Sequence, residues 1–396
     1  MHPIPLILGL AAVAPSSARP VEPIDTEVTI TRVAADRWQV DYVFAEPITA
    51  LELGGAIGSY RAEAWTVTTP GVELIERDGT EVLVAADSAR RHVRLMVDRY
   101  DDFVNGAYVP MIAFSDGGMA LFLGFFSGPA HAGGDTRELD ARFRLVPLAG
   151  ENAEAPSAGD TNAYAYFGPQ RPIEADFARL VLDPALPAWV RDELLSTAHA
   201  TADVLADGLG QPLPAPPLMM VGADRFQTYG GGSLKGGAIA DQFVVLLRGR
   251  GFVDAAPDVR AVVQRLFAHE IAHLFQLTTI PSGAYSVTEP WLHEGSAEAM
   301  AIYALGASGI WGPSRVDGYA ARAEAACEIA TGELPLAEAV RAGHGQAIYP
   351  CGLGLFWTHG ADPVTLWSRL AARVRAGEPY TTATLAEVVR RVEKAP

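Results

Sequence analysis

Residues 257–275 of the chain read PDVRAVVQRLFAHEIAHLF. The apolar residues up to Phe267 recur at three- and four-residue intervals, which is the pattern of one helix face. Pro257 suits the first helical turn, where no backbone N–H is needed. The stretch therefore predicts a helix that carries His269 and His273 at positions i and i+4, one turn apart on the same face. Two imidazoles in this arrangement can bind one metal ion, and the spacing is typical of zinc.

The residue that follows the first histidine, Glu270, predicts a second part of the same site. It is rotated by about 100° from His269 around the helix axis, so it cannot bind the ion in the same way. We expect Glu270 to act as a general base that polarises a water molecule at the open position of the metal. The HExxH pattern fixes only three residues, so the alternative is an amphipathic helix with surface histidines.

A second stretch supplies a third ligand. Residues 289–298 read EPWLHEGSAE and open another predicted helix. The carboxylate of Glu294 can complete a site of two histidines and one glutamate for one Zn²⁺ ion, which leaves a fourth position for water. Glu298 lies one turn further and can accept the free ring N–H of a ligand histidine, which would orient the ring and raise its basicity. The alternative for Glu298 is a solvated surface carboxylate.

The pattern HExxH followed by WLxEGxAE resembles the gluzincin zinc metallopeptidases, which include the thermolysin-like, aminopeptidase and glycyl aminopeptidase-like families. Residues 349–356, YPCGLGLF, are similar to the Tyr-x-x-Gly helix start of these aminopeptidases. The resemblance covers residues 172–396 and implies zinc-dependent hydrolysis of a peptide or protein substrate. It also implies that Tyr349 donates a hydrogen bond to the tetrahedral oxyanion. The alternative is a buried structural tyrosine.

The glycine-rich segment before the HExxH helix departs from the pattern of this family. In the aminopeptidases the segment ends in a glutamate that binds the free amine of the substrate. In this chain no glutamate follows Gly236, Gly237 and Ala238 in the corresponding segment. Asp241 is the nearest carboxylate. We expect these four residues to bind an extended peptide, and exopeptidase and endopeptidase modes both stay open. The alternative is a flexible loop. A nucleotide site is not expected, because the GK[ST] ending of a phosphate-binding loop is missing.

Four further residues near these motifs have open interpretations. Cys327 and Cys351 are the two cysteines of the chain. They form either one disulfide, as in an oxidising compartment, or a pair of reduced buried thiols. His344 is a candidate second oxyanion donor or an exposed loop histidine between two glycines. His293, which precedes Glu294, is expected only to line the cleft.

The chain in front of these motifs has a different pattern. Short segments rich in Val, Thr, Tyr and Phe, such as VTITRV, WQVDYVF and MALFLGFF, alternate with turn residues at the spacing of a sandwich. We predict an all-β, sandwich-like domain over residues 25–148, a linker rich in Ala, Gly and Pro over 149–171 and a catalytic domain over 172–396. With the resemblance, this gives an α+β fold: a β domain followed by a thermolysin-like, mainly helical domain with a small β-sheet.

Length, charge and hydropathy limit the number of domains and the kinds of partner that we expect. At 396 residues the chain can form two cores, since single cores rarely grow beyond about 300 residues. A formal net charge of −17, with no dense Lys/Arg cluster, argues against a nucleic-acid partner. No segment reaches the roughly 20 continuous apolar residues of a membrane span, so we expect no transmembrane segment in the mature chain. The oligomeric state stays open.

The first 18 residues resemble a signal peptide. An apolar stretch from Ile4 to Ala14 precedes small residues, with Ser16 and Ala18 just before a plausible cleavage site. This pattern predicts a periplasmic or secreted protein. An apolar N-terminal strand is the alternative.

Two functions from different classes are compatible with these features. The first is a zinc metallopeptidase with one Zn²⁺ ion. The second is a non-catalytic extracytoplasmic protein that binds peptides on the same fold, which the missing amine-gripping glutamate suggests. Metal analysis combined with a peptide-cleavage assay distinguishes them.

Overall fold

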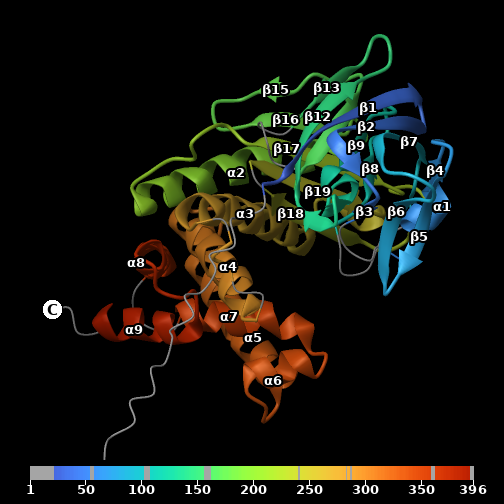
Figure 1. Ribbon diagram of the computed structural model, residues 1–396. Coiled ribbons are helices and arrows are strands. Elements are labelled where there is room, and N and C mark those ends of the chain that lie inside the picture. Colours follow the sequence, from blue (N-terminus) through green and yellow to red (C-terminus); the bar gives the residue numbers. More distant parts are fainter. Residues whose placement is uncertain are drawn as a thin grey trace, which may run out of the picture.

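The computed structural model is an α+β structure in which β-sheets come first and helices follow (Figure 1). This confirms the predicted fold class. The structure describes residues 22–53, 58–101, 108–155, 162–239, 241–281, 283–285, 288–357 and 362–392. The predicted signal peptide, residues 1–18, lies outside the described residues. No helix among the described ranges is long and apolar enough to cross a membrane.

The N-terminal part contains three sheets, and the first shows why this sequence forms strands. In β1 (Ile24–Ala34), every second side chain from Ile24 to Ile30 is buried, as expected for a strand with one face on a core. The strand order is β12-β1-β2-β7-β4. The other members are β2 (Arg37–Ile48), β4 (Trp65–Val67), β7 (Arg90–Asp98) and β12 (Leu139–Val146).

The second and third sheets complete this part, together with α1 (Tyr60–Ala64) and the short 3-10 helix η1 (Leu123–Phe126). The second has the order β11-β10-β3-β6-β5 and the third β13-β14-β9-β8. Their strands are β3 (Ala50–Glu52), β5 (Val72–Arg77), β6 (Thr80–Ala85), β8 (Met111–Ala113), β9 (Met119–Phe122), β10 (Ala130–Ala132), β11 (Asp135–Arg137), β13 (Asn152–Glu154) and β14 (Tyr164–Gly168).

The segment predicted as a linker, residues 149–171, therefore carries two strands. All five residues of β14 are buried, and the strand pairs with β9 of the β domain. The Tyr and Phe side chains of β14 are buried, although the residues around this strand are rich in Ala, Gly and Pro. The prediction of a plain linker is thus wrong for this segment, and the division into domains at residue 172 stays a prediction.

The fourth sheet separates two hydrophobic cores. Its order is β15-β16-β17-β19-β18. Along β19, Val244 and Leu246 belong to the core of the β-sheets, whereas Phe243, Val245 and Leu247 belong to the core of the helices. Side chains alternate between the faces of a strand, so one sheet serves both cores. The strands are β15 (Ile173–Glu174), β16 (Arg179–Leu182), β17 (Leu218–Asp224), β18 (Ser233–Ile239) and β19 (Gln242–Arg248).

The two helices predicted from residues 257–275 and 289–298 are both present, as α3 and α4. Proline stands in the first turn of α3, α4, α5 and α8, where it costs no hydrogen bond. The bounds are α2 (Ala188–Leu209), α3 (Pro257–Thr279), α4 (Pro290–Ala307), α5 (Pro313–Thr331), α6 (Leu336–Arg341), α7 (Ile348–Trp357), α8 (Pro363–Arg375) and α9 (Thr382–Val392), with the 3-10 turns η2 (Arg250–Phe252) and η3 (Gly345–Ala347).

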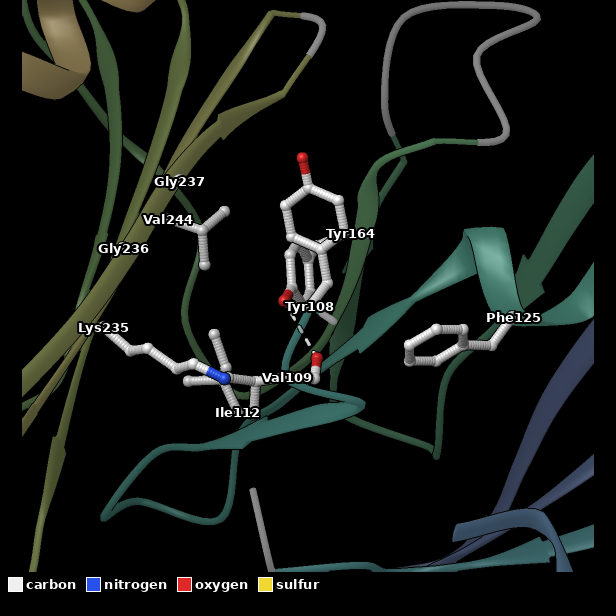
Figure 2. Close-up of a pocket in the computed structure, with 9 residues that line it drawn as sticks. All are labelled: Tyr108, Val109, Ile112, Phe125, Tyr164, Lys235, Gly236, Gly237 and Val244. Carbon is white, nitrogen blue, oxygen red and sulfur yellow. Dashed lines mark hydrogen bonds between the residues drawn. The ribbon is translucent and has the colours of Figure 1, made fainter. Parts of the chain in front are cut away.

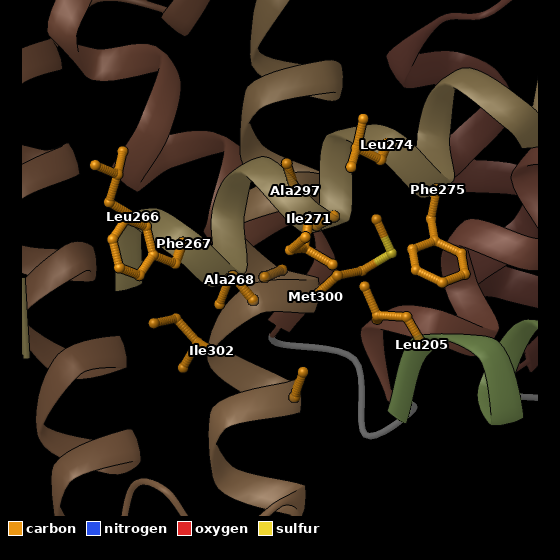
Figure 3. Packing of buried hydrophobic residues seen from close by; sticks show 14 of the residues in the cluster. Leu205, Leu266, Phe267, Ala268, Ile271, Leu274, Phe275, Ala297, Met300 and Ile302 are labelled. Carbon is orange, nitrogen blue, oxygen red and sulfur yellow. The ribbon is translucent and has the colours of Figure 1, made fainter. Parts of the chain in front are cut away.

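Helix α3 lies between the fourth sheet and α4 (Figure 1). Figure 3 shows the packing that holds it there: Ile271 of α3 meets Ala297 and Met300 of α4 in a fully buried cluster. Cys327 of α5 and Cys351 of α7 form a disulfide, which decides the open question about these thiols. Helices α3 and α4 are thus held together by fully buried side chains.

Candidate metal centre

Helices α3 and α4 bring His269, His273 and Glu294 to one point. The Nε2 atoms of the two histidines lie 3.0 Å apart, and Oε2 of Glu294 lies 3.3 Å from each of them. Ligand atoms bound about 2.1 Å from a tetrahedral zinc ion lie roughly 3.4 Å from one another. The three atoms therefore fit three corners of a zinc site, and this donor set is one that zinc prefers.

A hydrogen bond at the far side of each ring orients the two histidines. Nδ1 of His269 lies 2.9 Å from Oε2 of Glu298, and Nδ1 of His273 lies 2.6 Å from Oε1 of Gln276. The amide of Gln276 in turn donates to the hydroxyl of Ser296 at 2.7 Å. Because both Nδ1 atoms face an acceptor, both Nε2 atoms point to the common centre, as ligand histidines require.

The carboxylate of Glu298 lies behind His269 and is almost fully buried, at 1% exposure. Nη1 of Arg265 lies 2.9 Å from both of its oxygens, and the hydroxyl of Tyr319 donates to Oε1. Burial raises the pKa of Glu298, but the hydrogen bond from His269 and the charge of Arg265 outweigh burial and lower the pKa to about 2. Glu298 is therefore an anion at neutral pH and a strong acceptor for the imidazole.

In the absence of metal, the carboxylates of Glu294 and Glu298 shift the pKa of His269. Burial lowers the pKa of His269, but its hydrogen bonds to Glu294 and Glu298 outweigh this and raise the pKa to about 10. The histidines lower the pKa of Glu294 well below its usual range, although burial opposes them. The site thus favours a positive charge between these carboxylates, which a divalent cation can supply.

Glu270 lies beside this centre and against the edge strand β18. One carboxylate oxygen accepts a hydrogen bond from the backbone N–H of Ala238. The other, Oε2, is buried and has no hydrogen-bond partner among the described residues. A Cβ atom at Gly236 would lie 3.1 Å from Oε1 of Glu270, so the glycine lets the strand approach the carboxylate. Burial raises the pKa of Glu270, and the nearby histidines lower it only in part.

Tyr349, in the first turn of α7, lies on another side of the metal site. Its ring centroid is 6.0 Å from that of His269. Burial raises the pKa of the phenol to about 12, and the charges of Glu294 and Glu270 contribute to this rise. The hydroxyl is therefore protonated at neutral pH and can donate a hydrogen bond. Cys351, two residues further along the helix, ties this part of the chain to α5.

Neither a protein-family model nor a curated protein sequence matches the chain. Among solved structures, an aminopeptidase N family protein from Idiomarina loihiensis matches with a TM-score of 0.63 at 12% identity, over 94% of this chain and 73% of the other. The chain has the aminopeptidase N fold. The leukotriene A4 hydrolase of yeast, in complex with bestatin, matches with a TM-score of 0.50 at 10% identity, over 96% of this chain and 69% of the other.

A third structure, an M1 zinc metallopeptidase from Deinococcus radiodurans, matches with a TM-score of 0.46 at 17% identity, over 95% of this chain and 90% of the other. At these identities the two comparisons with TM-scores of 0.63 and 0.50 show a shared fold. What happens at the site has to be inferred from its own residues.

On this aminopeptidase N fold, three of the four predicted substrate-binding residues lie along β18. Gly236 and Gly237 line a cavity of about 470 Å³, together with Lys235 of the same strand (Figure 2). A Cβ atom at Gly237 would lie 3.4 Å from the ring of Tyr108, which belongs to the β domain. Ala238 contacts Glu270, as described above. Asp241 lies in the turn between β18 and β19, two residues beyond the end of β18.

His344 and His293, the two further histidines noted in the sequence, differ in their distance from the candidate metal centre. His344 is exposed at the start of η3, and the described residues show no contact between its ring and the metal site. The ring of His293 lies against that of His273, with centroids 4.4 Å apart and the planes tilted by 33°, and its Nδ1 atom is buried without a hydrogen-bond partner in the described part of the chain. Burial lowers the pKa of His293 well below its usual value, so this ring is neutral.

Four residues of the site are absent from the sequence-based prediction. Arg265 precedes His269 by four positions and Gln276 follows His273 by three, so helical spacing alone could have indicated both. Tyr319 reaches Glu298 from α5, and Tyr108 reaches Gly237 from the β domain. No local pattern connects these two tyrosines to the HExxH helix.

Proposed function

We propose that the chain is a zinc-dependent peptidase. The observation that carries the proposal is a buried carboxylate oxygen of Glu270, without a partner among the described residues, beside the converging atoms of His269, His273 and Glu294. A bound zinc ion would supply a water molecule of lowered pKa and would polarise the carbonyl group of the substrate. The roles of the protein side chains follow from their positions.

Glu270 acts as the general base and then as the acid. It takes a proton from the attacking water and delivers it to the amine that leaves. Its pKa is raised by burial, which makes the carboxylate a better proton acceptor than an exposed glutamate. The N–H of Ala238 fixes one oxygen and leaves Oε2 to receive the proton.

Tyr349 stabilises the charge that develops on the carbonyl oxygen. The pKa of its phenol is about 12, so the hydroxyl stays protonated at neutral pH. Tyr349 therefore acts as a hydrogen-bond donor and not as a base. A single donor of this kind contributes about 3 to 4 kcal/mol to transition-state stabilisation in comparable sites.

The substrate is an extended peptide that lies along β18. This strand is the last in the order of its sheet, and an edge strand offers backbone N–H and C=O groups for main-chain pairing. Gly236 and Gly237 let a peptide approach closely. Asp241 lies in the turn that follows this strand and serves as a candidate contact for a substrate amine.

The decisive experiment replaces Glu270 with Gln, which removes the base but keeps the shape. We expect zinc content equal to that of the unmodified protein and loss of cleavage of a mixed peptide pool by at least a hundredfold. Equal cleavage by both proteins would refute the proposed mechanism. Protein without zinc that binds peptides and never cleaves them would favour the rival function, a non-catalytic peptide-binding protein.

We also propose that the protein is exported. Two independent features support this: the apolar leader that ends near Ala18, and the disulfide between Cys327 and Cys351. Disulfides persist in oxidising compartments such as the periplasm and are rare in the cytosol. Fractionation of cells that make the full chain tests the proposal.

A further inference from the structure

A second cavity, of about 570 Å³, lies between the first half of α3 and α5. Three arginines line it: Arg265 from α3, and Arg315 and Arg322 from α5. One carboxylate, that of Asp258, also lines it. Three guanidinium groups around one cavity are unusual in a chain whose formal net charge is −17. This concentration of positive charge is what an anionic ligand requires.

Two aromatic rings hold the arginines of α5 in place. Arg315 lies over the ring of Trp311 at 5.8 Å, and Arg322 lies over the ring of Tyr319 at 5.9 Å. Neither arginine forms an ion pair within the described part of the chain. A guanidinium group that rests on a ring has already lost part of its side-chain freedom, so binding of an anion costs less entropy.

Arg265 connects the cavity to the metal centre. Both of its hydrogen bonds to Glu298 come from Nη1, and Glu298 is the residue that orients His269. A guanidinium group has five N–H donors, so Arg265 can hold Glu298 and still donate to a ligand in the cavity. Its charge is largely balanced by Glu298, which leaves Arg315 and Arg322 as the cations that pair with a bound anion.

We propose that this cavity binds the oxyanion group, phosphate or carboxylate, of a small organic molecule. Planar guanidinium groups match the geometry of both oxyanions. The volume falls in the range of about 300 to 1,000 Å³ that is typical of ligand pockets, so it also accommodates an organic part beside the rings of Trp311 and Tyr319. The proposal does not depend on the proposed peptidase activity, because its evidence comes from the first half of α3, from Trp311 and from α5.

The test measures binding of two probes, inorganic phosphate and acetate, to the full chain by calorimetry at constant ionic strength. Arg265 is left unchanged because it contacts Glu298. The variant is the double substitution Arg315→Gln and Arg322→Gln. The matched control is Arg369→Gln, which removes one positive charge from an exposed position on α8. Zinc content and thermal unfolding are measured for all proteins, so that a folding defect is recognised.

We expect saturable binding of at least one probe at one site per chain. The double variant should weaken it by at least tenfold, and Arg369→Gln should leave it within twofold of the unmodified protein. Binding of phosphate alone would assign a phosphate group to the ligand, and stronger binding of acetate a carboxylate. The proposal is wrong if neither probe saturates a site, if the double variant binds as the unmodified protein does, or if Arg369→Gln weakens binding equally.

Discussion

Gly295 of α4 and Gly352 of α7 meet backbone to backbone. A Cβ atom built on Gly295 would lie 2.1 Å from the carbonyl carbon of Gly352, and one on Gly352 would lie 2.3 Å from the carbonyl oxygen of Trp291. Only two glycines allow the helix axes to come this close. The contact sets the distance between Glu294, next to Gly295, and Tyr349, one turn before Gly352.

The first prediction is that Gly352→Ala destabilises the protein and separates Tyr349 from the metal centre. The new methyl group meets backbone atoms, which cannot rotate away as a side chain can. Overpacking of this kind costs about 1 to 3 kcal/mol, and we expect the upper end of this range in the free energy of unfolding by denaturant. Catalytic turnover should fall with it.

The control for this prediction is Gly354→Ala on the same helix. Its Cβ atom meets nothing within 4 Å, and alanine favours a helix over glycine by about 1 kcal/mol. This variant should be as stable as the unmodified protein or more stable. Equal losses for both variants would mean that the helix crossing is not the cause.

The second prediction concerns the residue behind His269. Glu298→Gln keeps the shape of the side chain but removes the charge that Arg265 and the imidazole both use. Loss of such a partner behind a ligand weakens metal affinity by about ten- to a hundredfold. Competition with a chromophoric chelator measures the change. Tyr319→Phe, which removes one hydrogen bond and no charge, should have a smaller effect, and an unchanged zinc affinity in Glu298→Gln would contradict the role of Glu298.

The three residues of the candidate metal centre could be predicted because their spacing is local. The two histidines lie one helical turn apart in a single apolar-periodic stretch, and Glu294 opens the next helix within a motif of its own. The bounds of α8 were also predictable, since Asp362 caps the helix and Pro363 begins it. In each of these cases a few neighbouring residues contain the whole signal.

Long-range pairing was not predictable in this way. In the first sheet Ile24 pairs in parallel with Leu139, and no period within either segment indicates the other. Strand β14 was missed because a short strand buried on both faces does not alternate, and its neighbours are rich in Ala, Gly and Pro. Tyr108 was missed because its place beside Gly237 exists only after the β domain has packed against β18.

The third prediction is that protons compete with zinc. In the metal-free protein the pKa of His269 is raised to about 10, so the ring is protonated at pH 7, whereas zinc requires a neutral imidazole. Zinc binding at pH 7 should therefore release a proton from His269, and affinity should rise about tenfold per pH unit for this proton. Calorimetry in buffers of different ionisation enthalpy counts the protons. Zinc affinity that does not change between pH 6 and 8 would contradict this.

The same shift predicts how the stability of the metal-free protein depends on pH. The folded-state pKa of His269 lies above its unfolded value of about 6.5, so its contribution is complete below that pH and is lost as the pH rises towards 10. After removal of zinc by a chelator, the melting temperature should fall between pH 7 and pH 10. A His269→Gln variant should show a shallower fall, because it lacks this titration.

The fourth prediction concerns the disulfide between α5 and α7. Cys327 and Cys351 are 24 residues apart, and closing a loop of this length restricts the unfolded chain by about 3 kcal/mol in the chain-entropy model. The double substitution Cys327→Ser and Cys351→Ser should lower the free energy of unfolding by this order. Turnover should also decrease, because Tyr349 lies two residues before Cys351 and loses the tie that fixes its helix to α5.

Reduction supplies the matched measurement for this last prediction. A reductant should lower the melting temperature of the unmodified protein towards that of the double variant and should leave the variant unchanged, because the variant has no sulfur bond to break. Zinc content has to be measured before and after, since a thiol reductant also binds zinc; a phosphine avoids this. If complete reduction, verified by mass, leaves both the melting temperature and the turnover of the unmodified protein as they were, the disulfide does not stabilise α7, and packing such as the contact between Gly295 and Gly352 positions Tyr349 without it.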